Sequence, residues 1–183
     1  MELTKNLTQT KLVKSLIVIV LGSIALTISA KIKIPFYPVP MTMQTFVVLF
    51  LGISFGYKVG LATVGLYLIE GIAGFPVFSN SPEKGVGIVY FTGPTMGYLI
   101  GFLTACYIAS KIKVNDSFFI ILTKLIIATS TIYILGLIWL GTLIGWDKPI
   151  MALGAKPFLL AETFKIVLLA LVTKQILKIR NII

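Results

Sequence analysis

The residues best suited to chemistry are an acidic and a basic residue near the C-terminal end of the chain. Glu162 and Lys165 stand three positions apart inside an apolar run, and this spacing places two side chains on one face of a helix. An ionisable group at membrane depth costs about 2.5–3.5 kcal/mol on insertion scales, so each one is a functional candidate. The pair therefore predicts a polar binding site. The alternative is a structural ion pair that only neutralises itself.

Further polar groups stand at or near the beginnings of other apolar runs. Pro38-Val39-Pro40-Met41-Thr42-Met43-Gln44-Thr45 leads into one run and places Gln44 about one turn into a helix, after prolines that need no amide donor there. Gln44 offers both donors and an acceptor, and the alternative is that it bonds a neighbouring helix. A later loop carries Asn80, Lys84 and Tyr90, and the run after it opens with Gly93-Pro94-Thr95-Met96-Gly97-Tyr98.

Several classes of chemistry are excluded by the residues that are absent from the sequence. The chain has no histidine and one cysteine, Cys106, which lies inside an apolar run. Histidine metal sites, Ser-His triads, Cys-His pairs and disulfides are therefore excluded. We expect no metal site and no cofactor. An intramembrane enzyme that uses Glu162 and Lys165 as acid and base on a lipid is the rival class, but few nucleophiles remain for it.

The composition requires lipid as part of the solvent of this protein. Of 183 residues, 57% are hydrophobic and 12% are charged, and the mean hydropathy is +1.02. A spanning helix needs about 20 apolar residues, and the apolar runs fall at about residues 12–30, 41–55, 59–75, 92–110, 118–140 and 158–177. We predict an all-α, polytopic membrane protein whose residues 1–183 form a single domain, a single bundle of six transmembrane helices.

The loops between the runs are of two alternating kinds, which sets an orientation. Segments 56–58 and 111–116 are short and basic, whereas segments 31–40, 76–91 and 141–157 are longer and rich in proline, glycine and aromatic residues. The positive-inside rule places the short basic loops and both termini in the cytoplasm. The net charge of +10 is then explained by basic flanks, and nucleic-acid binding is not expected. The polar groups named above gather in the outer half of the bilayer, which predicts an outward-facing pocket for a small amphiphilic molecule.

Small residues recur at helical spacing. Two series of glycines recur at every fourth residue. The first is Gly52, Gly56 and Gly60, and the second is Gly93, Gly97 and Gly101. Such series allow close helix contact in lipid, so they favour packing within the bundle over dimerisation. In the first run Gly22, Ala25 and Ser29 share one face, which we interpret as a candidate docking surface for another membrane subunit.

Three strings of the sequence resemble the BioY family, the biotin-binding S components of energy-coupling factor (ECF) transporters. They are residues 38–45, Gly74-Phe75-Pro76-Val77-Phe78 and residues 93–102, and the resemblance covers nearly the whole chain. It implies a six-helix fold and high-affinity biotin uptake across the bacterial cytoplasmic membrane. It also implies a coupling protein and two ATPases as partners, since this chain lacks the P-loop string. Homo-oligomers and an S component for another small vitamin are further possibilities.

The resemblance also assigns roles to the candidate residues. Glu162 is expected to accept from the ureido N–H groups of biotin, with Lys165 and Gln44 serving the polar ring. The family's sixth helix usually opens Pro-Phe-Leu-Pro-Gly-Asp, whereas this chain has Leu160-Ala161-Glu162 after Phe158-Leu159 and keeps the spacing to Lys165. The carboxylate is therefore one methylene longer. The residues expected near the tail carboxylate are Asn80, Lys84 and Tyr98, and those expected around the apolar middle are Phe36, Phe75 and Tyr90.

Overall fold

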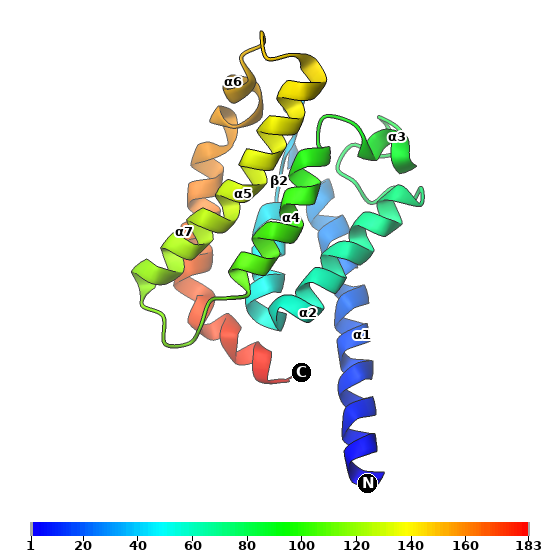
Figure 1. The fold of residues 1–183 in the computed structure, drawn as a ribbon, viewed down its shortest axis with the longest axis vertical. Helices are drawn as coiled ribbons and strands as arrows, with labels where there is room; N and C mark the ends of the chain where they lie inside the picture. Colours follow the sequence, from blue (N-terminus) through cyan, green and yellow to red (C-terminus); the bar gives the residue numbers. More distant parts are fainter. Residues whose placement is uncertain (1, 183) are drawn as a thin grey trace.

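The computed structural model describes residues 2–182, with side chains described for residues 11–180, and it is built almost entirely of helices (Figure 1). The long helices are α1 (Glu2–Lys31), α2 (Gln44–Ile72), α4 (Met96–Ala109), α5 (Phe118–Ile144) and α7 (Leu159–Ile176). The short elements are strands β1 (Lys33–Ile34) and β2 (Met41–Thr42), helices α3 (Gly87–Phe91) and α6 (Ile150–Gly154), and 3-10 turns at Lys156–Phe158 and Leu177–Ile182.

Helix α2 consists of two arms that meet at Gly56. The backbone there has φ 73° and ψ −179°, a conformation that glycine adopts readily and other residues avoid. The helix folds back at this point, so its two arms lie side by side as separate spans (Figure 1). The predicted runs 41–55 and 59–75 are therefore both confirmed, with a break of one residue instead of a loop.

A helix covers each of the six predicted apolar runs, although α1 begins at Glu2, ten residues before the predicted run 12–30. Three helices of the described chain, α1 over Lys11–Lys31, α2 and α5, are long and apolar enough to cross a membrane. Helix α4 is apolar but shorter, and α7 carries Glu162 and Lys165 in its first half. The prediction of an all-helical, six-span fold is confirmed. The antiparallel pairing of β1 with β2 and helices α3 and α6 were not predicted.

The glycine series pack helices together inside the bundle. A Cβ atom on Gly52 would lie 2.4 Å from the carbonyl oxygen of Cys106 in α4, and one on Gly97 would lie 2.3 Å from the carbonyl oxygen of Leu135 in α5. Because a backbone carbonyl cannot move aside cheaply, only glycine allows the helices to approach this closely. The packing interpretation of these series is confirmed.

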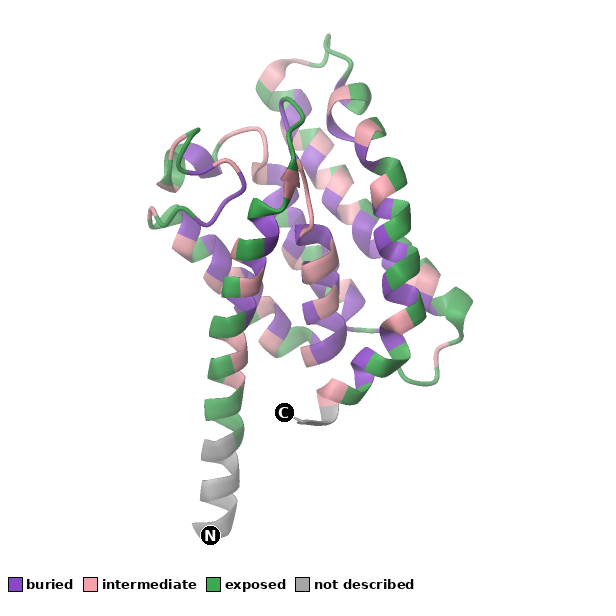
Figure 2. Ribbon diagram, turned by 180° about the vertical axis from the view of Figure 1, so that it is seen from behind, coloured by how far each residue is buried: buried purple, intermediate pink, exposed green. Residues whose placement is uncertain are grey.

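Helix α1 lies at the side of the bundle and packs on α2. Its N-terminal part extends away from the other helices (Figure 2), and its exposed side chains include Leu16, Val20 and Ile28. The proposed docking face does not lie on this open side. Gly22 and Ser29 are buried and Ala25 is half-buried, and a Cβ on Gly22 would lie 2.5 Å from Thr63 of α2. Helix α2 therefore packs against this face within the chain, and docking of another membrane subunit through Gly22, Ala25 and Ser29 stays a prediction.

Candidate binding site

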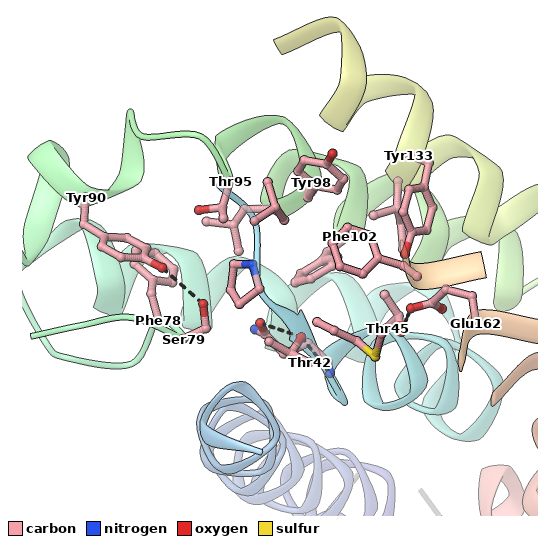
Figure 3. A pocket seen from close by; sticks show the side chains of 17 residues that line it. Thr42, Thr45, Phe78, Ser79, Tyr90, Thr95, Tyr98, Phe102, Tyr133 and Glu162 are labelled. Carbon is pink, nitrogen blue, oxygen red and sulfur yellow. Dashed lines mark hydrogen bonds between the residues drawn. The ribbon is translucent and has the colours of Figure 1, made fainter. Parts of the chain in front are cut away.

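A cavity lies between the helices (Figure 3). Its volume is about 50 Å³, which leaves room for a few water molecules. The walls come from the 39–45 segment, the α2–α3 connection with α3, and helices α4, α5 and α7. The lining residues are Val39, Pro40, Met41, Thr42, Gln44, Thr45, Phe78, Ser79, Tyr90, Thr95, Tyr98, Leu99, Phe102, Ile132, Tyr133, Phe158 and Glu162.

One end of the cavity holds a buried ion pair. Nζ of Lys165 lies 2.6 Å from Oε1 of Glu162, and both side chains are almost fully buried. The same ammonium donates to the backbone oxygen of Thr42 at 2.8 Å and to Oγ1 of Thr45 at 2.9 Å. Three acceptors match the three N–H donors of a lysine. Lys165 is therefore fully bonded within the protein.

The second oxygen of the Glu162 carboxylate is in a different situation. Thr45 donates to Oε1 at 3.0 Å, whereas Oε2 is buried and has no hydrogen-bond partner among the described residues. The Tyr133 hydroxyl of α5 lies beside this carboxylate in the cavity wall and is a hydrogen-bonding neighbour of Glu162 that a ligand would compete with. A buried carboxylate oxygen without a donor costs free energy, so this oxygen is suited to accept an N–H group from a ligand in the cavity.

The other end of the cavity is lined by aromatic rings and hydroxyl groups. Phe78 stacks on Tyr90 with ring centroids 5.2 Å apart, and the Tyr90 hydroxyl lies 3.2 Å from Oγ of Ser79. Gln44 lies between the two ends and donates through Nε2 to the Tyr67 hydroxyl at 2.7 Å. The cavity thus joins a carboxylate at one end to hydroxyl groups at the other through a largely apolar middle.

The structure brings four of the nine predicted binding residues into the cavity lining, namely Gln44, Tyr90, Tyr98 and Glu162. Their side chains are not equally available. Gln44 bonds Tyr67 and accepts from Thr42, and the Tyr98 hydroxyl donates to the carbonyl oxygen of Gly154 at 2.8 Å. Tyr98 therefore contributes its ring to the wall, and Glu162 keeps an unbonded oxygen.

The other predicted residues lie outside the lining. Lys165 stands behind Glu162 and is fully bonded, so it supports the carboxylate from outside the cavity. Oδ1 of Asn80 accepts from Lys33 at 2.9 Å, and Nζ of Lys84 lies over the ring of Tyr37.

The two remaining aromatic predictions also fall outside the lining. Phe36 packs edge-on against Phe158, with ring centroids 5.6 Å apart, and Phe158 itself forms the wall. Phe75 is 62% exposed and borders a separate groove with Ser23 and Glu70. Of the two phenylalanines in the Gly-Phe-Pro-Val-Phe string, Phe78 lines the cavity and the predicted Phe75 does not.

Sequence reasoning missed Thr45 and Tyr133 as members of the site. Thr45 follows Gln44 in the sequence, and its side chain points in a different direction from the helix. It bonds both Glu162 and Lys165. Tyr133 is a hydroxyl-bearing residue in the middle of α5, a mainly apolar helix that also carries Thr129, Ser130 and Thr131 just before it. A polar group at that depth was a usable signal, because such groups need a partner in lipid.

Comparison with known proteins places the chain in a family. Residues 3–181 match the BioY family. The chain belongs to the BioY family. A probable biotin transporter BioY of Pyrococcus horikoshii is 34% identical over 143 residues, covering 78% of this chain and 83% of that protein. The biotin transporter BioY of Thermotoga maritima is 32% identical over 155 residues, covering 84% and 90%.

A solved structure has the same fold as this BioY chain. It is the S-component for biotin from an ECF-type ABC transporter, with a TM-score of 0.76 and 23% sequence identity. The match covers 92% of this chain and 93% of that chain. The fold similarity therefore extends over nearly the whole chain. It is consistent with the match to the BioY family.

The acidic residues of this BioY chain are scattered over the part of the chain that the structure describes. Across the described residues, His, Cys, Asp and Glu side chains do not gather in groups of three that could hold a metal ion. Cys106 is buried against the glycines of α2. The polar chemistry of the site is therefore that of hydrogen bonds and one ion pair.

Proposed function

We propose that this chain binds biotin in the cavity and serves as the S component of an ECF-type transporter in the bacterial cytoplasmic membrane. The relatives named above are biotin transporters, and the structural neighbour is an S-component for biotin. In this proposal the six helices cross the membrane and both termini are cytoplasmic. Two ATPases and a coupling protein supply the energy, because this sequence has no P-loop string.

The observation that carries the proposal is the unbonded Oε2 atom of Glu162. Biotin presents two N–H donors and one carbonyl on its ureido ring, and a ureido N–H directed at Oε2 would satisfy that acceptor. Hydrogen bonds to charged groups contribute about 1.5–3 kcal/mol. A ligand without an N–H at this position would leave the carboxylate unpaired.

The remaining walls fit the rest of the molecule in this proposal. The ring system would lie against Tyr98, Phe102 and Phe158, which provide apolar surface. The valerate tail would extend toward Ser79 and Tyr90, whose hydroxyl groups line the far end. The predicted contributions of Asn80 and Lys84 to the tail carboxylate require that these side chains exchange their contacts with Lys33 and Tyr37 for contacts with the ligand.

Calorimetric titration of the purified protein in detergent tests this function. We expect one-to-one binding of biotin and none of thiamine or riboflavin. Biotin methylated on its ureido nitrogens is the sharper control, because it keeps the ring and tail but loses the N–H donors. Equal affinity for the methylated compound would remove Glu162 from the recognition of the ring. Binding of a different vitamin by a monodisperse sample would reassign the ligand.

A further inference from the structure

The residues that line the cavity imply that one of its walls moves when a ligand enters. This inference rests on the proposed binding of biotin. Phe78, Ser79, Tyr90, Tyr98, Phe158 and Glu162 all line the cavity and are all buried, so the packed walls separate it from the surroundings. Helices α4 and α5 pack closely, because Gly97 and Gly101 of α4 lie directly against the backbone of α5. These two helices are therefore poor candidates for that movement. The wall formed by Phe78 and Ser79 belongs to the irregular segment 73–86 between α2 and α3.

Two lysines, Lys31 at the end of α1 and Lys33 in β1, bond this segment. Nζ of Lys31 donates to the backbone oxygens of Phe78 at 2.7 Å and Ser81 at 2.6 Å. Nζ of Lys33 donates to the backbone oxygen of Ser79 at 2.7 Å and to Oδ1 of Asn80 at 2.9 Å. Four consecutive residues are thus bonded by two ammonium groups, and two of the four line the cavity.

The lysines do not line the cavity themselves. Neither Lys31 nor Lys33 is among its lining residues, and their donors are directed at backbone and amide oxygens of the segment. The segment is also connected to the cavity wall by the contact of Ser79 and Asn80 with the Tyr90 hydroxyl and by the Phe78 ring, which stacks on Tyr90. The lysines therefore control the position of the wall and have no direct contact with the ligand space.

We propose that Lys31 and Lys33 are positioning residues that hold the Phe78–Ser81 wall against the cavity and thereby set the rate at which ligand leaves. The wall must separate from these ammonium groups, or move together with the end of α1, for the cavity to open. Helix α1 itself packs mainly on α2, where Ser23 bonds Glu70, and most of its remaining surface is exposed and apolar. A displacement of the outer end of α1 would therefore pull the wall away from the ligand.

The test compares ligand dissociation from wild type, Lys31→Met, Lys33→Met and the double variant. After saturation with radiolabelled biotin and a chase with unlabelled biotin, we expect the double variant to release ligand about tenfold faster, given the worth of charge-assisted bonds, and each single variant to lie between. The Lys31→Arg/Lys33→Arg variant keeps the donors and should release ligand at close to the wild-type rate.

Two controls separate positioning from charge and from misfolding. Lys148→Met removes an exposed lysine that pairs with Asp147 and does not line the cavity, so it should leave the dissociation rate unchanged. Hydrogen–deuterium exchange without ligand should accelerate in residues 78–85 of the double variant, where Ser81, Lys84 and Gly85 amides donate within the segment, and stay constant in α5.

An unchanged dissociation rate in the double variant, with wild type binding biotin normally, would overturn the inference. Faster exchange throughout the protein would also overturn it, because the lysines would then be general stabilisers. Failure of the wild type to bind biotin would instead reject the proposed function.

Discussion

Lys165 bonds one oxygen of the Glu162 carboxylate and leaves the other oxygen without a donor. The ammonium lies 2.6 Å from Oε1, where Thr45 also donates, while Oε2 is buried and unbonded within the described residues. The pair is therefore asymmetric. A self-contained ion pair would be expected to satisfy both oxygens, so the arrangement favours a binding role over simple neutralisation. Lys165 orients the carboxylate, and Glu162 is the member of the pair that lines the cavity.

Removing the charge of Glu162 should weaken biotin binding. Glu162→Gln keeps the size of the side chain but replaces a charged acceptor, so we expect the dissociation constant to rise by about tenfold or more. Glu162→Asp restores the residue usual in the family and keeps the carboxylate, and its affinity should stay within about tenfold of wild type. Calorimetry on both variants provides the comparison. Equal affinities of wild type and the Gln variant would exclude the proposed contact.

Removing Lys165 should mainly lower the stability of the folded protein, and its effect on biotin binding should be indirect. Lys165→Met leaves a buried carboxylate without its cation, which typically costs about 3–5 kcal/mol. We therefore expect a large fall in the thermal unfolding temperature. The double variant Glu162→Gln/Lys165→Met has no buried charge left, so it should recover most of the stability and still bind biotin poorly. Thermal unfolding and calorimetry on the same samples separate the two effects. Recovery of binding in the double variant would contradict the role given to Glu162.

The fold was largely predictable because lipid imposes a simple rule on the sequence. Runs of apolar residues marked every span, and the spacing of Glu162 and Lys165 correctly placed the two on one helix face. The turn at Gly56 was less predictable, since it depends on a single positive φ value and on Arg180, which lies against that glycine. Helices α3 and α6 are five residues each, and such short elements depend on tertiary contacts more than on local sequence.

The site was only partly predictable, because the residue types of an irregular segment do not determine which of its side chains point into the protein. Phe75 and Phe78 belong to one short string, yet Phe75 is exposed and Phe78 is 1% exposed in the core. Likewise, Asn80 has the right chemistry for a ligand contact, but Lys33 occupies its side-chain oxygen. These outcomes depend on how segment 73–86 folds back on the helices, which no periodicity in the sequence encodes.

Two glycines of α2 should respond in opposite ways to alanine. The Gly52→Ala side chain would lie 2.4 Å from the Cys106 carbonyl oxygen, so α2 and α4 must separate, at a cost of about 1–3 kcal/mol. Gly65 has open space around its Cβ position, and Gly65→Ala should be neutral or stabilise the helix by up to about 1 kcal/mol. Thermal unfolding of the two variants provides the measurement. Equal unfolding temperatures would show that the α2–α4 contact tolerates a methyl group.

Low pH should reduce the stability that Asp116 contributes in the loop between α4 and α5. Burial alone would raise the pKa of the Asp116 carboxyl, but the bond from Lys124, at 2.6 Å, and the Lys113 amide lower it below the ordinary value of 3.8. A carboxyl whose pKa is lower in the folded state stabilises the protein above its unfolded pKa, and this contribution is lost as the pH falls through the folded value.

Asp116→Asn should therefore unfold at a slightly lower temperature than wild type at pH 7, and the difference should shrink as the pH drops below about 4. The effect is small because the pair is partly exposed and screened by solvent. Asp147→Asn is the matched control, since Asp147 pairs with Lys148 at a more exposed site and should leave the unfolding temperature unchanged at both pH values. Tryptophan fluorescence during heating reports the transition. A difference between wild type and Asp116→Asn that stays constant from pH 7 to pH 3 would mean that the loop is held by contacts other than the ionised carboxylate.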